Sequence, residues 1–129
     1  MKLLLDTHVL LWLDTDPQRL SARASALIRS RENVVYISAI VIWELAIKYR
    51  LGKLPSAAPL LEDYHASMHH YGFTELPFTA SHGLAERNLA TAHKDPFDRA
   101  LIAQAKHDDL VLISRDPAIS QAAVAQVVW

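Results

Sequence analysis

The 129-residue sequence contains no cysteine. Disulfides, zinc–thiolate sites and thiol nucleophiles are therefore excluded, and any metal ion must be held by oxygen atoms or imidazole. Long apolar runs are also absent, because the longest, Val34 to Trp43, is too short to span a bilayer. The apolar start resembles a signal peptide only briefly, since Asp6 and His8 interrupt it. We therefore expect a cytoplasmic protein without a membrane segment.

No charge sign dominates the composition. The net charge of −1 argues against a uniformly basic nucleic-acid binder. If five of the 14 acidic residues gather at one site, the other nine face 13 Lys and Arg residues. The protein surface is then basic around one acidic pocket, and that pattern suits a metal-dependent enzyme acting on a polyanion.

Short apolar segments alternate with helical patterns along the chain. Strands are expected at 2–5, 34–38, 73–76, 110–114 and 124–128, and helices at 8–13, 21–31, 39–51, 60–71, 79–90 and 96–106. In the helix after Ser38, Ile40, Trp43 and Ile47 are expected to form the buried stripe. Because no repeat or linker interrupts the alternation, the sequence predicts one α/β domain over residues 1–129. Its three layers, α/β/α, should enclose a mainly parallel central sheet.

The stretch from His93 to Arg99, His-Lys-Asp-Pro-Phe-Asp-Arg, opens the helix expected at 96–106. Asp95 has the position of an N-cap, with Pro96 at the first helical position. Asp98 follows in the first turn, close to Asp95 in space. Taken alone, two carboxylates at the positive end of a helix describe a well-capped helix.

Three more acids occupy matching places. Asp6 follows the first expected strand, Asp116 follows the strand at 110–114, and Glu44 lies in the helix after the second strand. Individually, Asp6 could be a cap and Glu44 a solvated side chain. Jointly, they converge on the carboxyl edge of a parallel sheet, where ligands bind. Because clustered carboxylates repel one another, such a site calls for a hard divalent cation, Mg²⁺ or Mn²⁺. The bound ion would activate water for phosphodiester hydrolysis.

Histidines offer a second possible metal site. His65 and His69 have the i, i+4 spacing of a metal pair. No acid completes a His-Glu-x-x-His pattern, and histidines near a helix end commonly interact with its dipole. We therefore reject a zinc site there.

Several blocks together resemble PIN-domain ribonucleases, and more narrowly the VapC-type toxins of toxin–antitoxin pairs. They are Leu-Leu-Leu-Asp6-Thr7-His8, Ser38 with Trp43-Glu44, Gly52-Lys53-Leu54, the Asp-Pro-Phe-Asp98-Arg99 block with Leu101-Ile-Ala-Gln-Ala105, and Ser114-Arg-Asp116. The likeness covers nearly the whole chain. Two departures concern substrate choice or local packing: Val41 replaces a small polar residue, and residues 120–127 lack a tyrosine.

The resemblance implies a three-layer PIN-like domain and a Mg²⁺-dependent endoribonuclease, with Mn²⁺ as a possible substitute. It implies that the catalytic and metal-binding acids are Asp6, Glu44, Asp98 and Asp116. Secondary roles fall to Asp95, Thr7, Ser114 and Arg99, for which capping or salt bridging is an equally simple explanation. The resemblance also implies an RNA substrate, inhibition by a small antitoxin protein, and a homodimer.

Three other readings remain for comparison. A catalytically idle module could use the same rim to hold RNA or a partner, although all four acids are present. A phosphoacceptor switch at Asp6 fits poorly, because a second acid is expected where His8 stands. A metal-free ribonuclease based on the seven histidines would leave a cyclic phosphate. We expect an inhibitor to cover the apolar surface near Leu10, Trp12 and Trp43.

Overall fold

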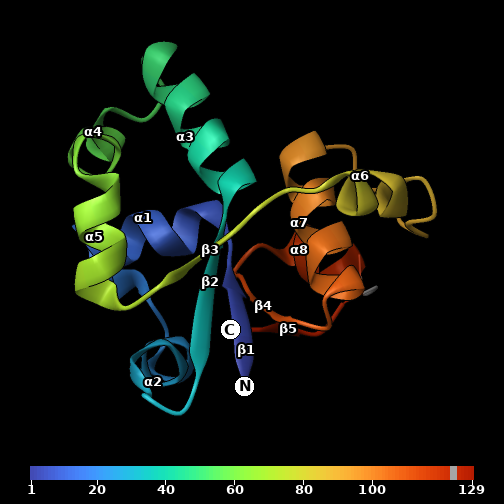
Figure 1. Cartoon of the computed structure of the whole chain (residues 1–129), viewed down its shortest axis with the longest axis horizontal. Helices are drawn as coiled ribbons and strands as arrows, with labels where there is room; N and C mark the ends of the chain where they lie inside the picture. Colours follow the sequence, from blue (N-terminus) through green and yellow to red (C-terminus); the bar gives the residue numbers. More distant parts are fainter. Residues whose placement is uncertain (123–124) are drawn as a thin grey trace.

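A computed structural model describes residues 1–122 and 125–129. Five parallel strands form one sheet in the order β3-β2-β1-β4-β5. The strands are β1 (Lys2–Leu5), β2 (Val34–Ser38), β3 (Thr74–Leu76), β4 (Val111–Ile113) and β5 (Val127–Val128). Figure 1 shows that the sheet twists strongly, since β4 and β5 cross the view while β1 and β2 run along it. The predicted parallel sheet is therefore confirmed.

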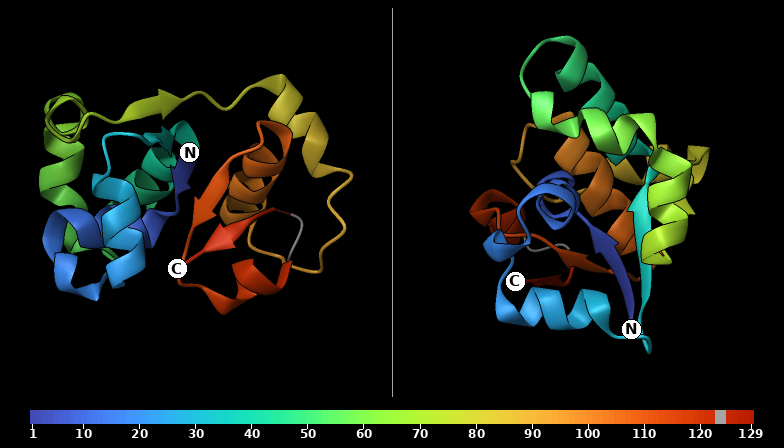
Figure 2. Two further views of the ribbon diagram at one scale, coloured as in Figure 1. Left: turned by 90° about the horizontal axis from the view of Figure 1, so that it is seen from below. Right: turned by 90° about the vertical axis from the view of Figure 1, so that its left-hand side faces the viewer.

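Helices cover both faces of the sheet, as Figures 1 and 2 show. One face carries α1 (Thr7–Thr15), α2 (Ala22–Arg29), α4 (Ala58–Glu62) and α5 (Tyr64–Tyr71), with α3 (Ala39–Arg50) above them. The other face carries α6 (Ala80–Glu86), α7 (Pro96–His107) and α8 (Pro117–Ala122). Short 3₁₀ turns, η1 (Pro17–Arg19) and η2 (Pro55–Ala57), connect the helices of the first face. This is the α/β/α arrangement expected from the sequence.

Strand β1 lies at the centre of the sheet and is packed on both sides. Leu3, Leu4 and Leu5 are fully buried, with Leu4 paired to Tyr36 on β2 and to Leu112 on β4. A continuous apolar run is the pattern of a strand covered on both faces. Among the described residues, every helix is too short or too polar to cross a membrane.

The predicted buried stripe of α3 is wrong. Trp43 is 59% exposed, and the fully buried face of the helix carries Val41, Glu44 and Leu45. The helix is apolar nearly all round, so hydrophobic periodicity does not select a face. The selection instead reflects partners for Glu44, the one acidic residue of this helix.

Other predicted boundaries need smaller corrections. The helix expected at 60–71 is two helices, α4 and α5, separated at Asp63. Helix α6 ends at Glu86 and not near residue 90, and α2 ends at Arg29. The strand expected at 124–128 covers only Val127 and Val128, and Val124 lies outside the described residues. Gly52, expected to end α3, follows it with φ of +74°, a left-handed conformation that favours glycine.

Candidate active site

The strand order reverses direction between β1 and β4. The chain proceeds from β1 outward to β2 and β3, then crosses back to β4 on the other side of β1. At such a switch point, loops leave adjacent strands on opposite faces and open a crevice at the carboxyl edge. The two strands stay joined there, because the Asp6 N–H donates to the Ile113 carbonyl over 3.1 Å.

Asp6 is both a helix cap and a buried acid of this crevice. Its Oδ1 accepts the Val9 N–H over 2.8 Å at the start of α1, and its Oδ2 accepts the hydroxyl of Ser114 after β4. The side chain is only 5% exposed. Burial raises the pKa of Asp6, even though both hydrogen bonds oppose the shift. The sequence left a cap and a site residue as alternatives for Asp6, and in the structure this residue both caps α1 and lines the crevice.

Glu44 enters the crevice from α3, which begins directly after β2 at its N-cap Ser38. The carboxylate is 3% exposed. The Thr7 hydroxyl donates to Oε1 over 2.5 Å, and the Lys48 ammonium group pairs with Oε2. A buried carboxylate needs such partners, so Thr7 and Lys48 explain why α3 turns this residue inward.

The amino terminus of α7 supplies two more carboxylates. Asp95 is the N-cap, and its Oδ1 accepts the N–H groups of Phe97 over 2.9 Å and Asp98 over 3.1 Å. Burial raises the pKa of Asp98 to about 6, and repulsion from Asp95, Glu44 and Asp116 adds to the effect. The site therefore resists full ionisation when no cation neutralises it.

All five acids line one small cavity. Its volume is roughly 160 Å³, and its walls are Asp6, Thr7, His8, Glu44, Lys48, Asp95, Asp98 and Asp116. Asp116 also caps α8, because its Oδ1 accepts the Ala118 N–H over 2.9 Å. The structure thus brings the four proposed catalytic acids and two of the proposed secondary residues, Thr7 and Asp95, to the same wall.

The other two secondary residues do not line this cavity. Ser114 is fully buried and acts on the site through Asp6. Arg99 points away: it pairs with Glu86 and donates to the carbonyls of Thr91 over 3.1 Å and His93 over 2.8 Å. Its role in the structure is to hold the loop before α7.

Sequence reasoning did not assign His8, Lys48 and His93 to the site. His8 and Lys48 line the cavity, and the spacing of Lys48 four residues after Glu44 was the available signal. His93 lies with its Nε2 3.0 Å from an oxygen of Asp98. This nitrogen is buried and has no aligned hydrogen-bond partner among the described residues.

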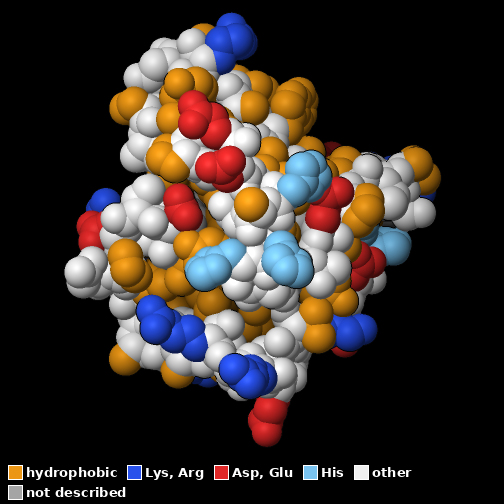
Figure 3. Space-filling model, turned by 60° about the vertical axis from the view of Figure 1, so that its left-hand side comes forward, with side chains coloured by type: hydrophobic (Ala, Val, Ile, Leu, Met, Phe, Trp, Pro, Cys, Tyr) orange, Lys and Arg blue, Asp and Glu red, His pale blue; other side chains and the backbone are white. Residues whose placement is uncertain are grey.

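The donors suit a hard divalent cation. Carboxylate oxygens predominate, and they carry more negative charge than Lys48 and His8 can balance. One atom each of His93, Asp98 and Asp116 lie within 4.8 Å of one another, close enough to share an ion. His65 and His69 are exposed on α5 instead. Figure 3 brings the side of the molecule that carries α4 and α5 forward, and histidine, acidic and basic side chains are scattered over it.

The open parallel sheet and the cluster of acids at its switch point define an α/β domain with an acidic cavity at the carboxyl edge, whose oxygen atoms could hold a cation. The chain belongs to the PIN domain family, whose model matches residues 3–125, and PIN domains are nucleases. No curated protein matches the sequence significantly.

Solved structures with the same fold include VapBC2 from Rickettsia felis bound to a promoter DNA fragment. The TM-score is 0.73 at 16% identity, covering 100% of this chain and 99% of that one. FitAcB from Neisseria gonorrhoeae gives a TM-score of 0.68 at 28% identity, covering 98% and 96%. VapBC-1 from nontypeable Haemophilus influenzae gives 0.69 at 19% identity, covering 99% and 97%.

Proposed function

We propose that this protein is a Mg²⁺-dependent endoribonuclease toxin of the VapC type that hydrolyses RNA phosphodiester bonds. The observation that carries the proposal is the gathering of five carboxylates from four separate segments around one cavity of roughly 160 Å³. Membership of a nuclease family and the likeness to VapBC and FitAcB structures support it. We further propose that the protein works in the cytoplasm as a homodimer.

Asp6, Glu44, Asp98 and Asp116 are the residues that would hold Mg²⁺ or its substitute Mn²⁺. When bound, the ion polarises the phosphoryl oxygen and lowers the pKa of water, so that no protein nucleophile is required. The raised pKa values of Asp6 and Asp98 agree with this assignment. A bound cation would offset the cost of burying these charges and the repulsion between them, which are the causes of the shifts.

The remaining residues of the site position its acids. Ser114 holds one oxygen of Asp6 while the Val9 N–H holds the other, so the carboxylate has a fixed orientation. Thr7 fixes one oxygen of Glu44 in the same way. Lys48 places a positive charge on the wall of the cavity, where it can also face a phosphate oxygen of the substrate. These contacts preorganise the site before substrate arrives.

We also propose that a small antitoxin covers the exposed aromatic surface beside the cavity. Trp43 is 59% exposed and contacts the ring of Phe97 edge to face, with centroids 5.6 Å apart. Phe97 lies next to Asp98, so a protein bound to this pair reaches the acid cavity. Leu10, which the sequence placed on the same surface, is only 1% exposed and is removed from it. Trp12 is partly buried.

The decisive experiment measures cleavage of single-stranded RNA with Mg²⁺, with EDTA, and by the Asp6→Asn variant. Asparagine is as good an N-cap as aspartate, so this variant keeps the start of α1 and removes the charge. We expect cleavage to fall by about 100-fold or more in EDTA and in the variant, in line with the several kcal/mol that a catalytic ion supplies. The products should carry a 5′-phosphate and a 3′-hydroxyl.

A thermal-denaturation titration adds a readout that does not depend on activity. Mg²⁺ at about ten times its dissociation constant should stabilise the wild type by roughly 1.4 kcal/mol, and Asp6→Asn should respond less. Undiminished cleavage in EDTA, or a cyclic phosphate product, would instead identify a metal-free ribonuclease.

A further inference from the structure

A second, larger cavity opens beside the acid cavity. Its volume is about 560 Å³, within the range of about 300 to 1,000 Å³ typical of small-molecule sites. Its walls are Asp6, His8, Trp12, Arg19, Arg115, Asp116 and Pro117. Three of these residues, Asp6, His8 and Asp116, line the acid cavity too. A chain molecule lying across the acids can therefore continue directly into this second space.

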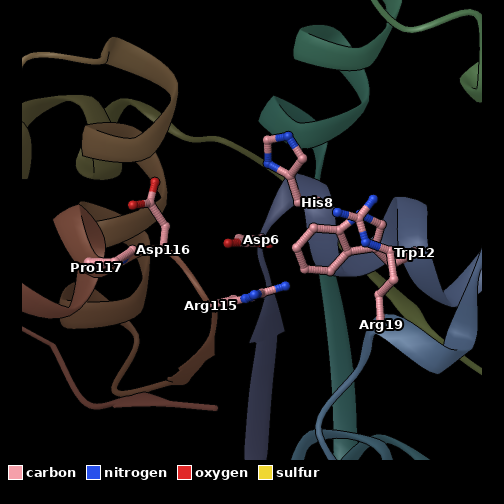
Figure 4. Close-up of a pocket in the computed structure, with 7 residues that line it drawn as sticks. All are labelled: Asp6, His8, Trp12, Arg19, Arg115, Asp116 and Pro117. Carbon is pink, nitrogen blue, oxygen red and sulfur yellow. The ribbon is translucent and has the colours of Figure 1, made fainter.

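The walls of this cavity combine an indole ring with two guanidinium groups, as Figure 4 shows. The guanidinium carbon of Arg19 lies 4.7 Å from the centroid of the Trp12 ring, and that of Arg115 lies 6.0 Å from it. Trp129 packs edge to face against the same ring, with centroids 6.0 Å apart. The indole is thereby held in place, and it holds the two cationic groups at the cavity.

Both arginines are available to a ligand. Their side chains are exposed, and in the described part of the chain neither lies within ion-pair distance of a carboxylate. They come from distant segments, Arg19 from η1 and Arg115 from the loop after β4. A planar guanidinium binds phosphate oxygens with two parallel N–H groups, and an aromatic ring stacks on any nucleobase.

We propose that this cavity binds the nucleotide of a single-stranded RNA that lies next to the scissile phosphate. Arg19 and Arg115 turn from the Trp12 ring to contact its phosphate, and the indole surface that they uncover contacts its base. The inference rests on the proposed ribonuclease function and adds a substrate subsite to it. A nucleotide fits better than an acidic peptide, because this space adjoins the acid cavity, whose carboxylates would repel an acidic peptide but could bind a phosphodiester through a divalent cation. Stacking without base-edge contacts predicts tolerance of base identity at this position.

The test measures binding of a fluorescein-labelled 12-nucleotide RNA by anisotropy with Mg²⁺. The Asp98→Asn background keeps the RNA intact. Arg19→Ala and Arg115→Ala should each weaken binding about fivefold or more, and each should reduce the slope of log affinity against log salt by roughly 0.7. Trp12→Leu, which keeps an apolar side chain but removes the ring, should weaken binding roughly fivefold.

Arg23→Ala is the matched control, since Arg23 is an exposed arginine of α2 outside both cavities. It removes the same charge and should change affinity less than twofold. Arg19→Ala is the decisive variant, because Arg115 adjoins Asp116 and its removal could disturb that acid. Circular dichroism melting shows whether Trp12→Leu is folded, and the arginine variants test the proposal in either case.

The outcomes separate the subsite from the proposed function. If wild-type protein cleaves RNA while Arg19→Ala and Arg115→Ala bind it as Arg23→Ala does, the subsite is overturned and the nuclease stands. If the two variants keep RNA affinity but lose a protein inhibitor, the cavity belongs to that partner and the subsite is equally overturned. If the wild type neither binds nor cleaves RNA, the proposed function fails and the subsite fails with it.

Discussion

The two ends of helix α7 carry clusters of the same residue types with opposite electrostatic character. At the amino end, His93 lies beside Asp98, whose pKa is raised to about 6 by burial and neighbouring acids. At the carboxyl end, Asp108 accepts hydrogen bonds from His82 and His107, each over 2.8 Å. Burial raises the pKa of Asp108, but these hydrogen bonds outweigh it, and the pKa lies below its ordinary value.

Either cluster has the geometry to hold a cation, since three potential ligand atoms lie within 4.8 Å in both. The two clusters differ in how far hydrogen bonds and charges within each cluster balance its acidic groups. Nδ1 of His82 accepts the Thr79 N–H over 3.0 Å, which leaves Nε2 to donate to Asp108. The carboxyl-end cluster is complete without a ligand, and it joins α6 to α7. The amino-end cluster instead keeps an excess of negative charge. Because both clusters have suitable ligand geometry and only one has this excess, geometry alone does not identify a functional site.

The largest expected difference between the two ends is in catalysis. Asp98→Asn should lower RNA cleavage by about 100-fold or more, because it removes a charge that would hold the cation. Asp108→Asn makes the same chemical change at the other end of the helix and should leave cleavage within about twofold. Single-turnover cleavage rates measure both. Equal losses in the two variants would contradict the assignment of the amino end as the active site.

Stability should show the reverse order. His82 is 4% exposed and makes hydrogen bonds through both ring nitrogens. His82→Ala therefore leaves a cavity, a Thr79 N–H without its acceptor, and an Asp108 carboxylate with one hydrogen bond fewer. We expect the free energy of unfolding to fall by about 2 to 3 kcal/mol. His93→Ala, the counterpart at the amino end, should cost less than about 1 kcal/mol. Urea denaturation measures the free energy of unfolding of both variants. A larger loss in His93→Ala than in His82→Ala would contradict the prediction that the carboxyl-end cluster contributes more to stability.

The smallest effect is a pH dependence of stability in the metal-free protein. Between the ordinary pKa of Asp98, 3.8, and its raised value of about 6, the native state binds more protons than the unfolded state. The free energy of unfolding therefore falls as pH rises through this window, by an amount on the order of 1 kcal/mol because solvent screens this partly exposed carboxyl group. Asp6, whose pKa is also raised, contributes in the same direction.

Denaturation in EDTA at several pH values between 4 and 7 measures this slope. Asp98→Asn should reduce the slope and stabilise the metal-free protein near pH 7. Asp108 has the opposite sign, because its lowered pKa stabilises the protein at pH values above the ordinary pKa of 3.8, and that contribution is lost as the pH falls below it. An unchanged slope in Asp98→Asn would show that this carboxyl group is not destabilised in the native state.

The sequence predicted the strands well because short apolar segments between helical patterns have few other solutions. It also predicted the cap at Asp95 and the acids at the strand ends, since both depend on local order along the chain. The face of α3 was not predictable, because Ile40, Trp43 and Ile47 are as apolar as the residues that are buried. Glu44 settles the orientation through Thr7, a partner 37 residues away.

Features that depend on distant pairs were out of reach of sequence reasoning. The hydrogen bond between His82 and Asp108 joins residues 26 positions apart, and no sequence pattern around either residue predicts it. The cavity around Trp12 requires Arg19 and Arg115 to meet across the sheet edge. The separation of α4 from α5 at Asp63 interrupts a good helical pattern, and local propensity gave no sign of it.

The hydrogen bond between Ser114 and Asp6 joins residues 108 positions apart. Synthesis delivers the amino-terminal half of the fold first, and strand β4 with its serine emerges near the end. A ribosome-bound chain consequently holds Asp6 without Ser114 and Asp116, and its acid cavity is incomplete. If the proposed function holds, translation itself delays RNA cleavage until strand β4 and Asp116 have been made.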